Sequence, residues 1–237
     1  MTKYLGFDLE VCTWPEENDW DRNTPLGISC IGLMGTGWDE PVVYYSGYSG
    51  NNPLPRPMHH DEISACFTHM RELTYEDYKI VSWNGLQFDF LVMALDDPGN
   101  DVAYAKFAMD HIDPMFEIFC RKGWPVGLNA VAKGMRLPGK TEGVSGADAP
   151  AMWMEGTLED RQKVLEYVGQ DAKTTLDIVE VGTRIEKLNW QSKSGKWQSI
   201  PYKTPLTTSG CLKLPQVDTS WMTDPMTRMS FYDWTES

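Results

Sequence analysis

A strict alternation near the N-terminus constrains the fold more than any other feature. Residues 3–11 divide into an apolar and a more polar set: Leu5, Phe7, Leu9 and Val11 against Tyr4, Gly6, Asp8 and Glu10. A period of two predicts a β-strand, with Asp8 and Glu10 side by side on the face opposite the apolar residues. After a polar loop, residues 26–34 and 41–46 are rich in β-formers and are separated by a Gly-Thr-Gly turn. Three strands with short connections predict an antiparallel meander.

The chain then becomes mainly helical. A helical period spans residues 60–78, and residues 79–83 read as a short strand ending at Asn-Gly. Four short helices are expected, at residues 88–95, 102–109, 115–121 and 128–135. The third has Asp113 as its N-cap and a proline at its first position. Residues 138–151 are rich in Gly, Pro and Ala and predict a loop, and a capping box at Thr157 begins a long helix that ends near residue 187.

The C-terminal residues follow a different pattern. Residues 190–202 predict a hairpin around Ser194-Gly195, and the remainder has no clear period. With 237 residues, 41% of them hydrophobic, the chain can bury one substantial core. We therefore expect one domain over residues 1–187, with a hairpin and extension at residues 188–237 packed on it.

Cysteine usage and the N-terminus indicate a cytoplasmic protein. The cysteines are odd in number, far apart and never spaced as C-x-x-C, which argues against a disulfide framework and a structural zinc site: Cys12, Cys30, Cys66, Cys120 and Cys211. The first residues lack a basic region followed by an apolar stretch, and no apolar run reaches membrane-spanning length. We expect the chain to be neither exported nor bound to a membrane.

The charge distribution leaves room for a polyanionic partner. The net charge is −13, whereas a phosphate-binding surface is normally basic. Residues 121–140, however, hold five basic residues and no acid, and residues 184–213 hold six basic residues against Glu186 alone. Each segment is either a strand-contacting surface or an ordinary solvated face. Charge by itself does not predict nucleic-acid binding.

Three separate segments supply acids in a consistent order. The first is Phe-Asp-x-Glu at residues 7–10, on the first strand. The second, Asn-Gly-x-x-Phe-Asp at residues 84–89, lies where a strand ends and a helix begins. The third is Tyr167-x-x-x-Asp171, whose spacing of four places both side chains on one helix face. Two metal ions about 4 Å apart require several carboxylates from separate elements, and this conjunction meets that requirement.

These segments resemble the three motifs of the DEDDy subgroup of DnaQ-like 3′-to-5′ exonucleases. They are especially similar to the proofreading domain of family-B DNA polymerases and its stand-alone relatives, over about residues 3–185. A sister subgroup has His five positions before the last Asp, where this chain has Glu166. The tyrosine subgroup instead has Tyr four positions before that Asp, and this chain has Tyr167 there. The resemblance implies an α/β, ribonuclease H-like fold: a mixed sheet of three antiparallel strands plus parallel strands, flanked by helices.

The resemblance also implies a two-metal site with Mg²⁺ or Mn²⁺. Asp8 would bridge both cations, Glu10 and Asp171 would complete the site of the cation that activates water, and Asp89 would hold the second cation through water. Tyr167 would orient the attacking water. Asn84 and Phe88 would contact the terminal nucleotide, and the basic residues expected to bind substrate are Lys133, Arg136 and Lys140. The predicted reaction releases 5′-mononucleotides from a nucleic-acid 3′ end, with single-stranded DNA favoured over RNA.

Three other interpretations are open. Residues 134–141 match the phosphate-binding pattern G-x-x-x-x-G-K-[ST], but a predicted helix precedes them where that pattern needs a strand. A non-catalytic nucleic-acid-binding module would keep the fold without needing the carboxylates. An endonuclease of the ribonuclease H type would share the metals but would not need Tyr167. The four histidines are expected to be surface or core residues, and Trp83, Trp124 and Trp153 are candidates for either base stacking or core packing.

Overall fold

A computed structural model of the chain describes residues 2–14, 22–47, 52–138 and 144–236. Its main sheet has four strands in the order β3-β2-β1-β4: β1 (Lys3–Val11), β2 (Ile28–Gly35), β3 (Val42–Tyr45) and β4 (Tyr78–Val81). The first three pair antiparallel, with Asp8 opposite Gly32 and Glu10 opposite Cys30, and β4 pairs parallel to β1. The predicted meander is confirmed, and so is the mixed α/β sheet.

The helices lie near their predicted positions. The first four are α1 (His60–Tyr75), α2 (Asp89–Asp96), α3 (Asp101–Asp110) and α4 (Pro114–Lys122), with a 3₁₀ turn at Pro98–Asn100. They are followed by α5 (Leu128–Gly134), α6 (Ala149–Met154) and the long helix α7 (Leu158–Ile185). Thr157 caps α7 by accepting a hydrogen bond from the Asp160 amide, and Asp113 caps α4 by accepting one from Phe116. Both predicted caps are confirmed.

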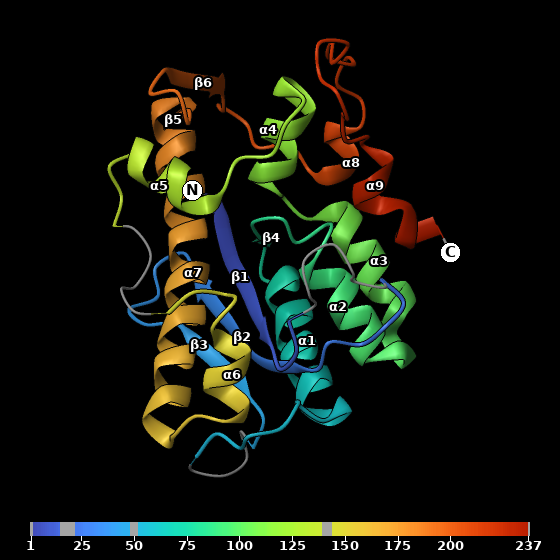
Figure 1. The fold of residues 1–237 in the computed structure, drawn as a ribbon, viewed down its shortest axis with the longest axis vertical. Helices are drawn as coiled ribbons and strands as arrows, with labels where there is room; N and C mark the ends of the chain where they lie inside the picture. Colours follow the sequence, from blue (N-terminus) through green and yellow to red (C-terminus); the bar gives the residue numbers. More distant parts are fainter. Residues whose placement is uncertain (1, 15–21, 48–51, 139–143, 237) are drawn as a thin grey trace.

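Helices cover both faces of the sheet (Figure 1). The long helix α7 crosses the face of β1 and β2 that carries Asp8, and α1 and α2 lie on the other side. On that second face the rings of Phe7 and Phe90 lie 5.2 Å apart. A sheet between two helical layers buries both of its faces, and β1 lies in its interior. The face of β1 that carries Asp8 is therefore covered by α7.

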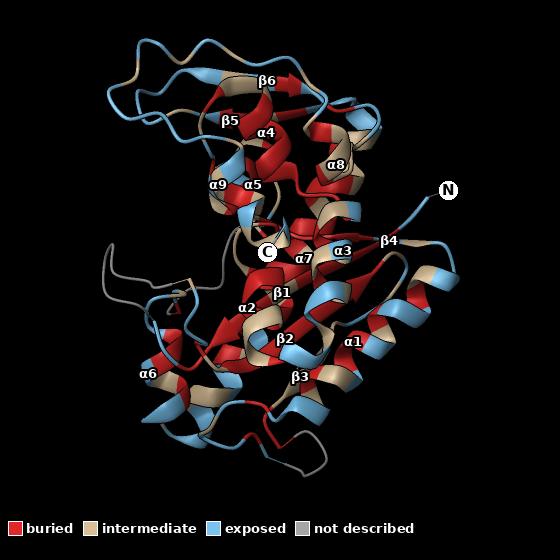
Figure 2. Ribbon diagram, turned by 90° about the vertical axis from the view of Figure 1, so that its right-hand side faces the viewer, coloured by how far each residue is buried: buried red, intermediate tan, exposed pale blue. Residues whose placement is uncertain are grey.

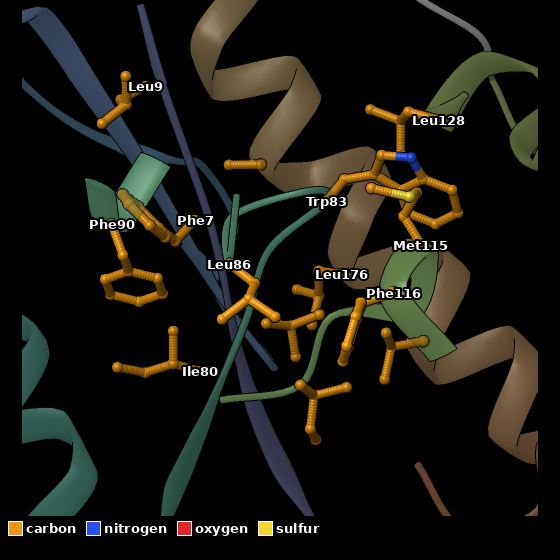
Figure 3. Close-up of a cluster of buried hydrophobic side chains, with 14 of the residues drawn as sticks. Phe7, Leu9, Ile80, Trp83, Leu86, Phe90, Met115, Phe116, Leu128 and Leu176 are labelled. Atoms are coloured by element: carbon orange, nitrogen blue, oxygen red, sulfur yellow. The ribbon is translucent and has the colours of Figure 1, made fainter. Parts of the chain in front are cut away.

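The core runs from the sheet into the C-terminal region. Buried residues, red in Figure 2, lie in the main sheet and the helices on it, and continue toward the second, two-stranded sheet. Close to β4, Trp83 packs against Met115 and Leu128, while Phe7 and Phe90 lie on the far side of Leu86 (Figure 3). Trp83 also donates a hydrogen bond to the Val126 carbonyl. These contacts fix the segment after β4, where the second acidic motif begins.

The predicted hairpin forms β5 (Lys187–Gln191) and β6 (Trp197–Pro201), at the C-terminal end of α7. Short helices follow: α8 (Thr208–Cys211), α9 (Met229–Tyr232) and a 3₁₀ turn at Asp233–Glu236. Leu188, Trp190 and Phe231 belong to the same hydrophobic core as the main sheet. Glu117 on α4 accepts a hydrogen bond from the Leu206 amide. The extension is thus closely packed, and the domain boundary at residue 187 stays a prediction.

One element is missed by the sequence patterns. Residues 149–151 were assigned to a loop because of their Gly, Pro and Ala content, but they begin α6. Pro150 is compatible with the first turn of a helix, since the amide it lacks would have no helical partner there. Trp153 is fully buried and donates to the Arg56 carbonyl, so tertiary packing stabilises this short helix. None of the helices in the described segments has the length and hydrophobicity to cross a bilayer.

Candidate active site

Two glycines allow α7 to approach the sheet closely. A Cβ on Gly6 would lie 2.3 Å from the Ala172 carbonyl oxygen, and one on Gly32 would lie 2.7 Å from that of Val168. Gly6 and Asp8 share a face of β1, and Gly32 is the partner of Asp8 across the sheet. This face of the sheet therefore meets the turn of α7 that contains the third motif.

The close approach brings acids from three elements into one region. Glu10 and Asp171 are buried, with 6% and 4% of their surface exposed, and Asp8 is half-buried. Asp89, at the start of α2, is 3% exposed. Burial of charged carboxylates is costly unless a partner compensates for it, so such a group indicates a functional role.

Asp89 is tied directly to the first motif. Its Oδ1 accepts a hydrogen bond of 3.2 Å from the backbone amide of Leu9, the residue between Asp8 and Glu10. Burial raises the pKa of Asp89 to about 8, although its hydrogen bonds from the backbone act in the opposite direction. In the absence of a bound cation, this carboxyl is therefore neutral over much of the pH range below 8.

Tyr167 lies among the other three acids. Burial is the main cause that raises the pKa of its hydroxyl, and the nearby carboxylates of Asp171, Glu10 and Asp8 raise it further. The hydroxyl also forms a hydrogen bond with Asp171. It stays protonated at neutral pH and can donate a hydrogen bond in the site. The phenol and the three carboxylates thus form one electrostatic unit.

The turn that precedes Asp89 is held by a residue whose role extends beyond capping. Asp113 is fully buried and accepts hydrogen bonds from the amides of Asn84 at 3.1 Å and Leu86 at 3.3 Å, besides the one from Phe116. Asn84 has φ of 70°, a left-handed conformation that Asn tolerates better than most residues. The interpretation of Asp113 as only a helix cap was too narrow. No local sequence pattern indicates that both of its carboxylate oxygens accept hydrogen bonds from the second motif.

An aromatic residue not predicted for the site lies beside Phe88. Trp14, just beyond the end of β1, is 47% exposed, and its ring centroid is 5.9 Å from that of Phe88. An exposed Trp next to the second motif offers a surface on which a base can stack. In the sequence, Trp14 is marked only by its position four residues after Glu10. That spacing alone does not identify a residue that stacks on a base.

The predicted basic contacts lie elsewhere. Lys133 and Arg136 are exposed at the end of α5 and line hollows against the β5–β6 hairpin. Lys140 lies outside the described residues, as does the Gly-Lys-Thr end of the phosphate-binding pattern. The described part of that pattern begins at Gly134, the last residue of α5. The structure therefore does not bring Lys133 or Arg136 into contact with the four acids.

The remaining candidates have structural roles. Trp83 and Trp153 are buried, while Trp124 packs edge-on against Trp221. Among the histidines, His60 pairs with Asp97, His69 shares a hydrogen bond with Tyr44, and His111 is buried against the Ala108 carbonyl. These contacts agree with the surface and core positions expected for the histidines. Core packing is the role of two of the three tryptophans.

The donor set suits a hard divalent cation. Asp8, Glu10, Asp89 and Asp171 offer carboxylate oxygens, the ligands that Mg²⁺ and Mn²⁺ prefer. Within the described residues, no three carboxylate, imidazole or thiol groups already form a closed set of metal ligands. Asp8, Glu10 and Asp171 lie near Tyr167, and Asp89 is joined to the first motif through the Leu9 amide. The residues fit a cation by their chemistry and by the elements that deliver them.

Comparison with known proteins gives two findings. The model of the RNase_H superfamily matches residues 32–182. The fold is similar to that of a family B DNA polymerase from the hyperthermophilic archaeon Pyrobaculum calidifontis, with a TM-score of 0.54 and 15% sequence identity. That similarity covers 77% of this chain but only 24% of the polymerase chain. No curated protein matches the sequence.

The family match begins within β2, after the first acidic motif on β1, and extends through the second and third acidic motifs to near the end of α7. The mixed sheet with helices on both faces agrees with it. The chain belongs to the RNase_H superfamily.

Proposed function

We propose that the chain is a metal-dependent 3′-to-5′ exonuclease of the DEDDy type, which releases 5′-mononucleotides from single-stranded nucleic acid, with DNA favoured. The observation that supports it most is the meeting of the three motifs. Asp89 accepts a hydrogen bond from the backbone amide that lies between Asp8 and Glu10. Tyr167 lies near Asp8, Glu10 and Asp171. Three dispersed segments of sequence thus supply one acidic region.

Each residue has a distinct proposed task. Asp8, Glu10, Asp89 and Asp171 would hold two cations, Mg²⁺ or Mn²⁺. When bound, these ions would activate water and neutralise charge on the scissile phosphate and the leaving 3′-oxygen. Tyr167, protonated at neutral pH, would orient the attacking water through its hydroxyl.

The terminal nucleotide would lie against the second motif. Asn84 is half-buried and held in a fixed turn by Asp113, so its side chain can serve as a rigid polar contact. Phe88 and Trp14 together present an aromatic surface to the terminal base. The fold similarity to a polymerase from the B family is consistent with a nucleic-acid 3′ end as substrate.

The decisive experiment is digestion of 5′-labelled single-stranded DNA and RNA with Mg²⁺ or Mn²⁺. The expected product pattern is a descending ladder that Asp171→Ala abolishes. Asp177→Ala is the matched control, because Asp177 lies on the same helix but pairs with Lys173. A circular single strand should survive, and its cleavage would favour the endonuclease. Binding of DNA without any product would favour the non-catalytic module.

A further inference from the structure

The β5–β6 hairpin and the end of α5 enclose a groove that the four acids do not use. It consists of two adjoining hollows of about 520 and 370 Å³, which share Gly134 and Trp197. A Cβ on Gly134 would lie 2.2 Å from the carbonyl oxygen of Asn189, so α5 and β5 are in backbone contact. The groove therefore has a rigid floor. In Figure 1 it lies at the end of α7 where β5 begins.

The charge of this groove is opposite to that of the chain. Lys133, Arg136 and Lys187 line it, and no Asp or Glu does so among the described residues. None of these three cations forms an ion pair in the described segments, whereas Lys163, Lys173 and Lys203 each do. The neighbouring acid along the chain, Glu186, is paired with Lys203. In a protein of net charge −13, a basic groove without acids is suited to a polyanion.

The groove also contains an exposed aromatic ring and polar groups. Trp197 is 66% exposed and stands opposite Gln191 on the outer face of the hairpin. Asn189 lies on the same face and lines the first hollow. A positive groove with an aromatic platform is the usual means of binding single-stranded nucleic acid without sequence preference.

Arg136 holds its position at a conformational cost. Its φ is 59°, and the amides of Arg136 and Leu137 donate to the carbonyls of Lys133 and Ala132. This is the Schellman arrangement at a helix C-terminus, in which glycine is the favoured residue at the left-handed position. An arginine at this position makes the fold less stable than a glycine would, and it places a cation at the groove.

We propose that this groove binds a single strand of nucleic acid, with Lys133, Arg136 and Lys187 at phosphates and Trp197 stacked on a base. That the strand is the one whose 3′ end enters the acidic site rests on the proposed function, whereas binding itself does not. Ile185, at the groove, lies about 21 Å along α7 from Asp171. At the spacing of a duplex strand, about 3.4 Å per phosphate, this distance corresponds to about six nucleotides, and a more extended single strand would span it with fewer.

The first test measures binding of a fluorescent 15-nucleotide strand by anisotropy, in chelator so that nothing is hydrolysed. Trp197→Ala should weaken binding about tenfold. Arg136→Gly should weaken it severalfold and reduce the slope of log K against log salt by about 0.7, while it raises Tm. Lys163→Gln removes a positive charge outside the groove and is the control for the loss of charge. Asp77→Gly relieves a left-handed backbone conformation outside the groove and is the control for the change in stability. Unchanged affinity in both groove variants, or an equal loss in Lys163→Gln, would overturn the proposal.

The second test uses substrate length. Under the proposed function, kcat/KM of the groove variants should fall for a 15-nucleotide strand but match that of the wild type for a trinucleotide, which cannot reach the groove. Equal losses on both lengths would mean that the variants disturb the acidic site, and would overturn the groove. If the wild type hydrolyses nothing but Arg136→Gly still weakens binding in chelator, the groove stands and the nuclease assignment does not.

Discussion

Asp89 Oδ1 lies 3.2 Å from the amide nitrogen of Leu9. This contact joins the first turn of α2 to the middle of β1 and sets the second motif beside the two acids of the first. Because the donor is the backbone amide, this hydrogen bond does not depend on which side chain residue 9 carries. Substitutions at Asp89 can therefore separate its charge from its position.

We predict that Asp89→Asn stabilises the metal-free fold at high pH. Burial raises the pKa of Asp89 from its usual 3.8 to about 8, so the folded state binds the proton more tightly than the unfolded state. The stability contributed by this proton is complete below about pH 4 and is lost as the pH rises through about 8. Asparagine carries no charge and keeps an oxygen for the Leu9 amide. Its advantage over the wild type should therefore increase as the pH rises from 5 to 9.

Urea denaturation in chelator at pH 5, 7 and 9 measures this difference. With Mg²⁺ or Mn²⁺ present the order should reverse, because the wild type gains stability from cation binding and the variant gains less. A difference that stays constant with pH would show that Asp89 does not titrate in the folded state as its burial indicates.

Tyr167→Phe should lower kcat by roughly 10²-fold with little effect on KM. The substitution removes only the hydroxyl, while the buried ring keeps its packing against the core. Because burial and the neighbouring acids hold the pKa of this hydroxyl above its usual value, its ionisation should cause no loss of activity between pH 7 and 9. Steady-state kinetics on a labelled strand gives both quantities. If Tyr167→Phe keeps an activity within twofold of the wild type, the hydroxyl of Tyr167 does not contribute to the reaction.

Much of the fold could be predicted because local patterns and tertiary packing agree. The alternation in β1, the capping box at Thr157 and the proline after Asp113 each have a local physical cause, and each element formed close to its expected bounds. The tyrosine and aspartate of the third motif share a helix face for the same reason. Element type follows from periodicity, which is a local property.

The features that the sequence patterns do not predict have a common origin in contacts between distant segments. α6 is stabilised by the burial of Trp153, and Asp113 accepts hydrogen bonds from the amides of Asn84 and Leu86 in the turn before Asp89. The placement of Lys133 and Arg136 against the hairpin depends on the contact of Gly134 with β5. None of these contacts leaves a periodic trace in the sequence. Composition therefore predicts a loop where α6 begins, and the correct prediction of Asp113 as a cap does not include its contacts with the second motif. The meeting of the acids could be inferred only from the resemblance of their order to known motifs.

Gly6→Ala should displace α7 from the sheet. The added Cβ would lie 2.3 Å from the Ala172 carbonyl oxygen, and backbone cannot yield as a flexible side chain can. We expect a loss of about 2 kcal/mol in the free energy of unfolding. We also expect a loss of activity larger than this destabilisation explains, since Asp171 moves with the helix.

Gly127→Ala is the matched control for that substitution. Gly127 precedes α5, has an ordinary negative φ, and a Cβ there would meet nothing within 4 Å. Both variants are compared by thermal melting and by the rate of ladder formation at a temperature where each is fully folded. Equal activity of the two variants would show that the distance between α7 and β1 is not critical for the site.

Asp113→Ala should be strongly destabilising and should also impair the second motif. Three backbone amides, of Asn84, Leu86 and Phe116, lose their acceptor, and all lie in buried or half-buried positions. Loss of a helix cap and of two further bonds to buried donors should cost about 3 kcal/mol. Asp113→Asn keeps one acceptor oxygen and should fall between the wild type and the alanine variant. Hydrogen exchange at the Asn84 and Leu86 amides should accelerate in both variants, more in alanine. Exchange that remains as slow as in the wild type would mean that the turn is held by its own geometry, and Asp113 would again be only a cap.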